Sequence, residues 1–153
     1  MALATLSVRF DAEAERVAID GAMETSALLV VVNVLRMRPY PCTMRLLGPG
    51  GATLPEEEDL EPVRATARRA AALGIDTQLL RVTSSRPVQA LLEIVRERDA
   101  SLLVFGPDRA RVRERTLRRT AARLRERAPC LVWTPLCDDE WPAAPPPPGA
   151  RRR

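Results

Sequence analysis

The stretch Leu28–Leu35 reads LLVVVNVL and has Asn33 as its one polar residue. Its many β-branched side chains favour extended backbone. A strand that is apolar on both sides needs cover on both faces, and strands at the centre of a parallel sheet have such cover. This segment therefore predicts an α/β domain with helices on both faces of a mostly parallel sheet.

The other hydrophobic patterns predict strands that alternate with helices. The further expected strands are Thr5–Phe10, Ile75–Val82, Ser101–Phe105 and Cys130–Thr134. The expected helices are Ala14–Ala22, Asp59–Leu73, a segment that carries Val88, Leu91, Leu92 and Val95 after an N-cap at Ser85, and Glu114–Arg127. Such alternation indicates βαβ units with right-handed crossovers. The mixed polarity of Ile75–Val82 predicts a place near the edge of the sheet.

A length of 153 residues suits one domain. We expect an α/β domain over residues 1–136 and a disordered, Pro- and Arg-rich tail over residues 137–153. The connection Arg36–Glu58 is long enough to suggest a functional or mobile loop. No apolar run approaches the roughly 20 residues of a membrane span, and the N-terminus does not resemble a signal peptide, so we expect a cytoplasmic protein.

Two missing residue types exclude several enzyme classes. The chain has no histidine, which removes Ser-His-Asp and Cys-His catalysis. It has no lysine either, so all 24 basic residues are arginine, and the lysine-containing phosphate loop and Schiff-base chemistry are excluded. The three cysteines form no CxxC pair, which argues against a metal site. We therefore expect no enzyme.

Two segments near the C-terminus, Asp99–Gly106 and Arg127–Trp133, carry strand motifs that resemble those of the universal stress protein family. Asp99–Gly106 (DASLLVFG) is similar to the family's D-x-[IL]-[IV]-V-x-G strand, and Arg127–Trp133 (RAPCLVW) is similar to its A-P-C-P-V-L-V strand. The resemblance extends over about Thr5–Thr134. It implies a three-layer α/β sandwich of the adenine nucleotide alpha hydrolase-like type, with five parallel strands in the order 3-2-1-4-5.

The resemblance also implies a nucleotide site. Family members place an aspartate after the first strand, read adenine with a valine backbone after the second, and carry G-x-x-G-x9-G-[ST] before the last strand. The matching residues here are Asp11, Val34, Gly106, Arg109, Arg119 and Thr120. Asp11 also suits a helix N-cap, and a role as a cap alone is an equally good interpretation.

Arginine replaces two of the three motif glycines. Glycine lets backbone N–H groups approach phosphates and form an anion-binding nest. The Arg109 and Arg119 side chains either fill the cleft and abolish ATP binding or bind phosphate themselves, since guanidinium groups form bidentate bonds to phosphate. Because side chains replace a lost backbone nest poorly, we favour the blocked site.

The preferred hypothesis is a non-enzymatic regulatory or stress-response protein with a degenerate nucleotide site. It would act as a homodimer through the strand Cys130–Thr134 and need no cofactor. One alternative is an ATP or adenine-nucleotide sensor in which Arg109 and Arg119 hold phosphates. Another is a nucleic-acid-associating protein that uses the arginine-rich face Arg109–Arg127, but aromatic residues are only 3% of the chain, so stacking platforms are scarce.

Overall fold

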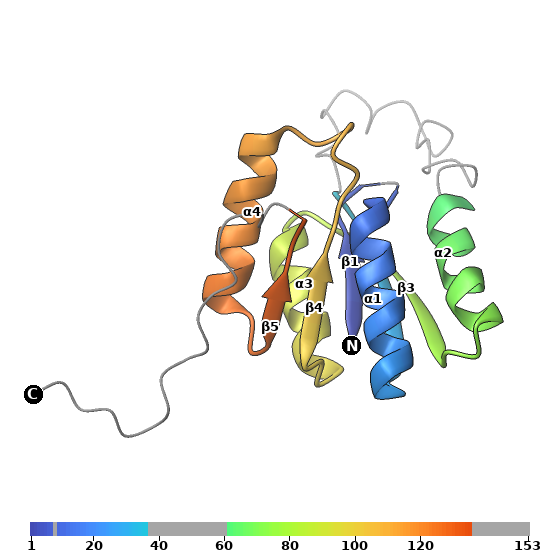
Figure 1. Cartoon of the computed structure of the whole chain (residues 1–153). Coiled ribbons are helices and arrows are strands. Elements are labelled where there is room, and N and C mark those ends of the chain that lie inside the picture. Colours follow the sequence, from blue (N-terminus) through green and yellow to red (C-terminus); the bar gives the residue numbers. More distant parts are fainter. Residues whose placement is uncertain (8, 37–60, 136–153) are drawn as a thin grey trace, which may run out of the picture.

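A computed structural model describes residues 1–7, 9–36 and 61–135 of the chain (Figure 1). Five parallel strands form one sheet in the order β3-β2-β1-β4-β5. The elements are β1 (Ala2–Thr5), α1 (Ala12–Thr25), β2 (Leu29–Arg36), α2 (Glu61–Ala72), β3 (Thr77–Ser84), α3 (Pro87–Glu97), β4 (Leu102–Phe105), α4 (Glu114–Arg127) and β5 (Leu131–Trp133). The predicted fold class and strand order are confirmed, and β3 lies at an edge as expected.

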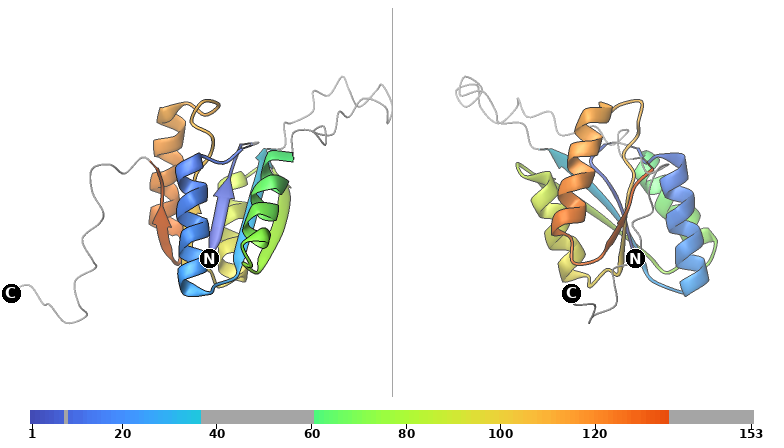
Figure 2. Two further views of the ribbon diagram at one scale, coloured as in Figure 1. Left: turned by 45° about the vertical axis from the view of Figure 1, so that its right-hand side comes forward. Right: turned by 60° about the vertical axis from the view of Figure 1, so that its left-hand side comes forward.

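Helices cover both faces of the sheet (Figure 2). On one face α1 and α2 pack against Leu3, Leu29 and Val31. On the other face α3 and α4 pack against Val32, Phe105 and neighbouring residues. The successive side chains of β2 alternate between the two cores, which explains why its sequence is apolar at almost every position.

The first strand is where the sequence prediction was wrong. Of the predicted strand Thr5–Phe10, Thr5 is the last residue of β1, and the described residues Leu6, Ser7 and Arg9 bend instead of continuing the strand. The Thr5 hydroxyl accepts the Ser7 N–H at 3.0 Å and donates to the Arg9 carbonyl at 3.0 Å, so it folds the chain back on itself. The Asn33 side-chain amide donates to the Ser7 carbonyl at 2.8 Å. These bonds satisfy backbone groups that a strand would have paired with its neighbours.

The predictions for two helix boundaries were also wrong. Helix α1 is longer than the predicted Ala14–Ala22, since it runs over 14 residues. Ser85 does not cap α3; the N-cap is Arg86, and its N–H is accepted at 3.0 Å by the hydroxyl of Ser84. The predicted tail 137–153 and all but the first residue of the loop Arg36–Glu58 lie outside the described residues.

Gly106 directly follows β4 and lies beside the first turn of α1. Its N–H donates to the Ala4 carbonyl at 3.1 Å, and its own carbonyl accepts the Asp11 N–H at 2.9 Å. A Cβ at position 106 would stand 2.0 Å from the Ala14 Cβ, far inside van der Waals contact. Glycine is therefore required here because α1 lies directly against the backbone of the β4 end.

We expect Gly106→Ala to destabilise the fold by ~1–3 kcal/mol, since the added methyl group must displace α1. Urea unfolding followed by circular dichroism measures this loss. Gly21→Ala is the matched control. Its new Cβ meets only the flexible end of Met1, at 2.8 Å from Cε, and alanine is favoured over glycine inside a helix by roughly 0.5–1 kcal/mol. Equal losses in both variants would contradict the packing argument.

Candidate ligand-binding site

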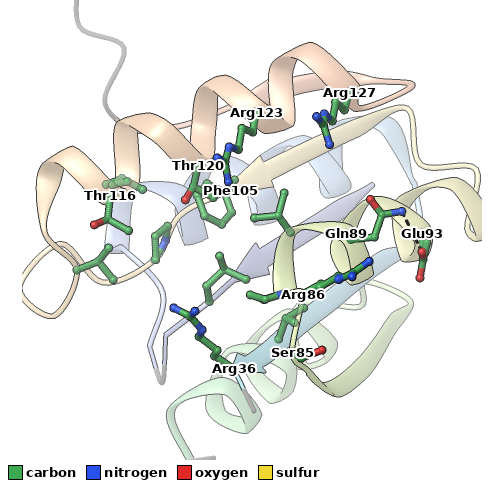
Figure 3. A pocket seen from close by; sticks show the side chains of 17 residues that line it. Arg36, Ser85, Arg86, Gln89, Glu93, Phe105, Thr116, Thr120, Arg123 and Arg127 are labelled. Carbon is green, nitrogen blue, oxygen red and sulfur yellow. Dashed lines mark hydrogen bonds between the residues drawn. The ribbon is translucent and has the colours of Figure 1, made fainter. Parts of the chain in front are cut away.

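A cleft of about 900 Å³ opens between α3 and α4 over the surface of the sheet (Figure 3). Its apolar wall includes Leu6, Val34, Phe105 and Pro107, which lie at or just beyond the carboxyl ends of β1, β2 and β4. Strand order reverses between β1 and β4, and ligands of open α/β sheets bind at this switch point. The cleft therefore occupies the position at which this fold binds ligands.

The polar part of the cleft is strongly basic. Among the described lining residues, four carry a guanidinium group and one carries a carboxylate: Arg36, Arg86, Arg123, Arg127 and Glu93. Figure 3 shows the Arg123 and Arg127 side chains reaching from α4 into the space that faces α3. The Glu93 carboxylate accepts the Gln89 side-chain amide at 3.0 Å. Guanidinium groups bind phosphate and carboxylate bidentately, so the cleft suits an anion.

Helical spacing explains how α4 supplies its share of the cleft. Thr116 and Thr120 are four residues apart, as are Arg123 and Arg127, and residues four apart lie on the same side of a helix. Leu117, Ala121 and Leu124 are buried and fix the rotation of the helix against the core. Because its buried residues are fixed in this way, α4 presents hydroxyl groups beside its first turns and guanidinium groups beside its last turns.

Some of the site residues predicted from the sequence line the cleft, and the others do not. Val34 and Thr120 line the cleft. Asp11 and Gly106 lie next to each other but are not among the lining residues. The Asp11 carboxylate caps α1 by accepting the N–H groups of Glu13 at 3.0 Å and Ala14 at 3.4 Å. The structure thus shows Asp11 in its capping role.

Neither of the two arginines at the motif glycine positions is among the residues that line the cleft. Arg119 is the sixth residue of α4, so its N–H belongs to the hydrogen-bond ladder inside the helix. A backbone nest cannot form there. Arg109 lies in the loop after β4, where the Asp108 carboxylate accepts the Ala110 N–H at 2.9 Å. The cleft is therefore open at the points where we expected these side chains to fill it.

Sequence reasoning assigned none of the basic lining residues to the nucleotide site, although Arg123 and Arg127 belong to the face Arg109–Arg127 considered for nucleic acid. Arg123 and Arg127 carried one usable signal, since they share a helix side and continue toward the C-terminus from Thr120. Arg36 ends β2 and Arg86 precedes Pro87, and only the three-dimensional fold places them in the same cleft as α4. No local pattern distinguishes these two arginines from the others in the chain.

Other kinds of site find little support in the described part of the chain. It contains no group of three or more His, Cys, Asp or Glu side chains that could hold a metal ion. Burial raises the pKa of the Cys130 thiol, which packs against the core instead of lining the cleft. Within the described residues, we find no helix whose length and hydropathy would let it cross a membrane.

The doubly wound parallel sheet, with a basic cleft at its switch point, defines the class as an open α/β fold with helices on both faces of one sheet. The model of the Universal stress protein family matches residues 9–134, and the chain belongs to this family. No curated protein matches the chain significantly.

Solved structures of universal stress proteins share the fold. One from Burkholderia pseudomallei is 22% identical, with a TM-score of 0.55, covering 86% of this chain and 93% of its own. A universal stress protein in complex with cAMP is 22% identical, with a TM-score of 0.57 and coverages of 88% and 95%. The protein from Archaeoglobus fulgidus in complex with dAMP is 16% identical, with a TM-score of 0.52 and coverages of 87% and 94%.

We expect Asp11→Ala to lower the free energy of unfolding by ~1 kcal/mol, because α1 loses its N-cap acceptor. Asp11→Asn is the matched control and should stay within a few tenths of a kcal/mol of wild type, since asparagine caps about as well. Urea unfolding of the three proteins checks this. Equal destabilisation by both substitutions would show that the charge of Asp11, and not its capping oxygen, stabilises the fold.

Proposed function

We propose that this protein is a non-catalytic regulatory member of its family that binds an adenine nucleotide or a related phosphorylated nucleoside in the α3–α4 cleft. The observation that carries the proposal is the combination, in one cleft, of an apolar wall with four guanidinium groups. A nucleotide needs both environments, since its base is largely apolar on its faces and its phosphate is anionic. Relatives whose structures are described as complexes with cAMP and dAMP add support.

The chemistry of binding follows from the positions of the residues. Val34 and Leu6 offer an apolar surface at the carboxyl edge of the sheet, where a base can be shielded from water. Thr116 and Thr120 offer hydroxyl groups that donate to or accept from a ribose. Arg123 lies one turn further along α4 and is placed to bind the phosphate.

In this proposal, arginine side chains of the cleft lining bind the phosphate in place of a glycine nest. They are not Arg109 and Arg119, the side chains that the motif spacing indicated. The cleft keeps its volume because Arg109 and Arg119 do not line it. We therefore favour the hypothesis that the cleft binds a nucleotide over the hypothesis that the site is blocked. The nucleic-acid alternative stays a prediction; among the described lining residues Phe105 is the one aromatic side chain, so base stacking along a strand has little support.

The lack of catalysis is proposed from the same lining residues. A general base must lie within hydrogen-bond reach of the group that it deprotonates. Glu93 is the one carboxylate among the described lining residues, and it is already bonded to Gln89. Ser85, Thr116 and Thr120 therefore have no activating partner among the described lining residues. Binding without turnover suits a regulatory protein.

We expect Arg123→Gln to weaken the binding of AMP about tenfold, the loss of one charge-assisted hydrogen bond at a solvent-exposed position. Isothermal titration calorimetry at low ionic strength measures the change. Arg119→Gln, on the same helix but outside the cleft lining, is the matched control and should bind like wild type. A loss in Arg119→Gln with Arg123→Gln unchanged would support the site implied by the motif instead.

We also propose that the protein forms a homodimer through β5. This strand is the last in the sheet order, so one of its edges has no partner strand within the described chain. Leu131 on this strand is 62% exposed. An apolar edge strand that faces water is an aggregation hazard, and pairing with a second copy removes the hazard.

We expect Leu131→Arg to shift the protein toward monomer, because a buried guanidinium would oppose association. Light scattering coupled to size-exclusion chromatography measures the mass. Leu79→Arg is the matched control, since Leu79 is 40% exposed on β3 at the opposite edge of the sheet. A dimer that survives Leu131→Arg but dissociates in Leu79→Arg would assign the interface to the β3 edge.

A further inference from the structure

We infer that the cleft selects phosphorylated ligands that arrive without Mg²⁺. It would then favour nucleoside monophosphates and cyclic monophosphates over the magnesium complexes of nucleoside triphosphates. This inference rests on the proposed function, because it concerns the chemical form of the ligand that the α3–α4 cleft accepts.

The described lining of the cleft offers few ligands for magnesium. Mg²⁺ requires oxygen ligands in near-octahedral geometry, and proteins usually hold it through one or two carboxylates together with substrate phosphates. The described lining residues supply one carboxylate, Glu93, and one of its two oxygens accepts the Gln89 amide at 3.0 Å. The remaining oxygen donors from side chains are neutral hydroxyl groups, such as those of Thr116 and Thr120.

The charge of the cleft also disfavours a bound metal ion. Four guanidinium groups and one carboxylate leave the described lining with three net positive charges (four minus one). A divalent cation entering this cleft is repelled by Arg36, Arg86, Arg123 and Arg127. Free ATP carries about two more negative charges than its magnesium complex, because the ion adds its own charge. The cleft therefore attracts the free nucleotide more strongly than the complex.

Mg²⁺ and the arginine side chains would compete for the same phosphate oxygens. When bound to a triphosphate, Mg²⁺ bridges the β- and γ-phosphate oxygens. Those are the oxygens that a guanidinium group would bind in a bidentate manner. Arg123 and Arg127 follow one another by a single turn of α4, about 6 Å along its axis, which suits successive anionic groups. Arginine would thus neutralise the phosphate charge, as a metal ion does in other nucleotide sites.

Solvent limits the size of the effect. All four arginines are exposed, so counterions screen their charges. We expect Mg²⁺ to weaken ATP binding about tenfold, not to abolish it. A nucleoside monophosphate has no adjoining phosphate with which to chelate the ion, so its binding should change less than about twofold.

The test is isothermal titration of the full chain with ATP and with AMP, each in EDTA and in excess MgCl₂, at ionic strength matched with NaCl. The expected result is a loss of ATP affinity in Mg²⁺ of about tenfold, with AMP nearly unchanged. Arg123→Gln should bind free ATP more weakly and show a smaller difference between the two conditions. Arg119→Gln, outside the lining, should keep the full difference.

The possible failures are distinguishable. ATP binding that is equal or tighter in Mg²⁺ overturns this inference and leaves the proposed function standing. An equal weakening of AMP and ATP by MgCl₂ also overturns it, because the effect would then be general screening. No binding of either nucleotide in either condition contradicts the proposed function, and this inference with it.

Discussion

The packing of α1 against the end of β4 fixes the carboxyl edge of the sheet, where the candidate site lies. The Gly106 backbone bonds both to Ala4 of β1 and to Asp11 at the start of α1. Ala14 lies so close to Gly106 that no side chain can be inserted between them. This contact fixes how β1 and β4 end beside each other, and the cleft opens on the other face of the same strands.

The retained glycine therefore has a packing role that is independent of any phosphate. In the motif that the sequence resembles, glycines permit close approach of backbone to ligand, whereas Gly106 permits close approach of backbone to a helix. The neighbouring motif positions do not have this constraint. Arg109 lies in a loop and Arg119 on the solvent side of a helix, so both positions tolerate a long charged side chain.

The proposed nucleotide site, in which arginine side chains bind the phosphate, would differ physically from one built from backbone N–H groups. A nest holds a phosphate at a fixed point with rigid dipoles, while guanidinium groups on flexible stems adapt to the ligand and lose side-chain entropy when they bind. The exposed arginines of the cleft, Arg36, Arg86, Arg123 and Arg127, are of the second kind. Such a site suits reversible regulation, because its affinity depends on salt and on competing cations.

The sequence by itself determined the alternation of elements, the buried β2 and the limits of α4, since these follow from local periodicity and burial. Through the family resemblance it also gave the strand order. It could not place β1, because the side-chain bonds of Thr5 turn an alternating segment away from the sheet. Only the tertiary structure decided the composition of the cleft. Arg36 and Arg86 line the same cleft as Arg123 because β2, α3 and α4 border one face of the sheet, and no spacing along the chain encodes that arrangement.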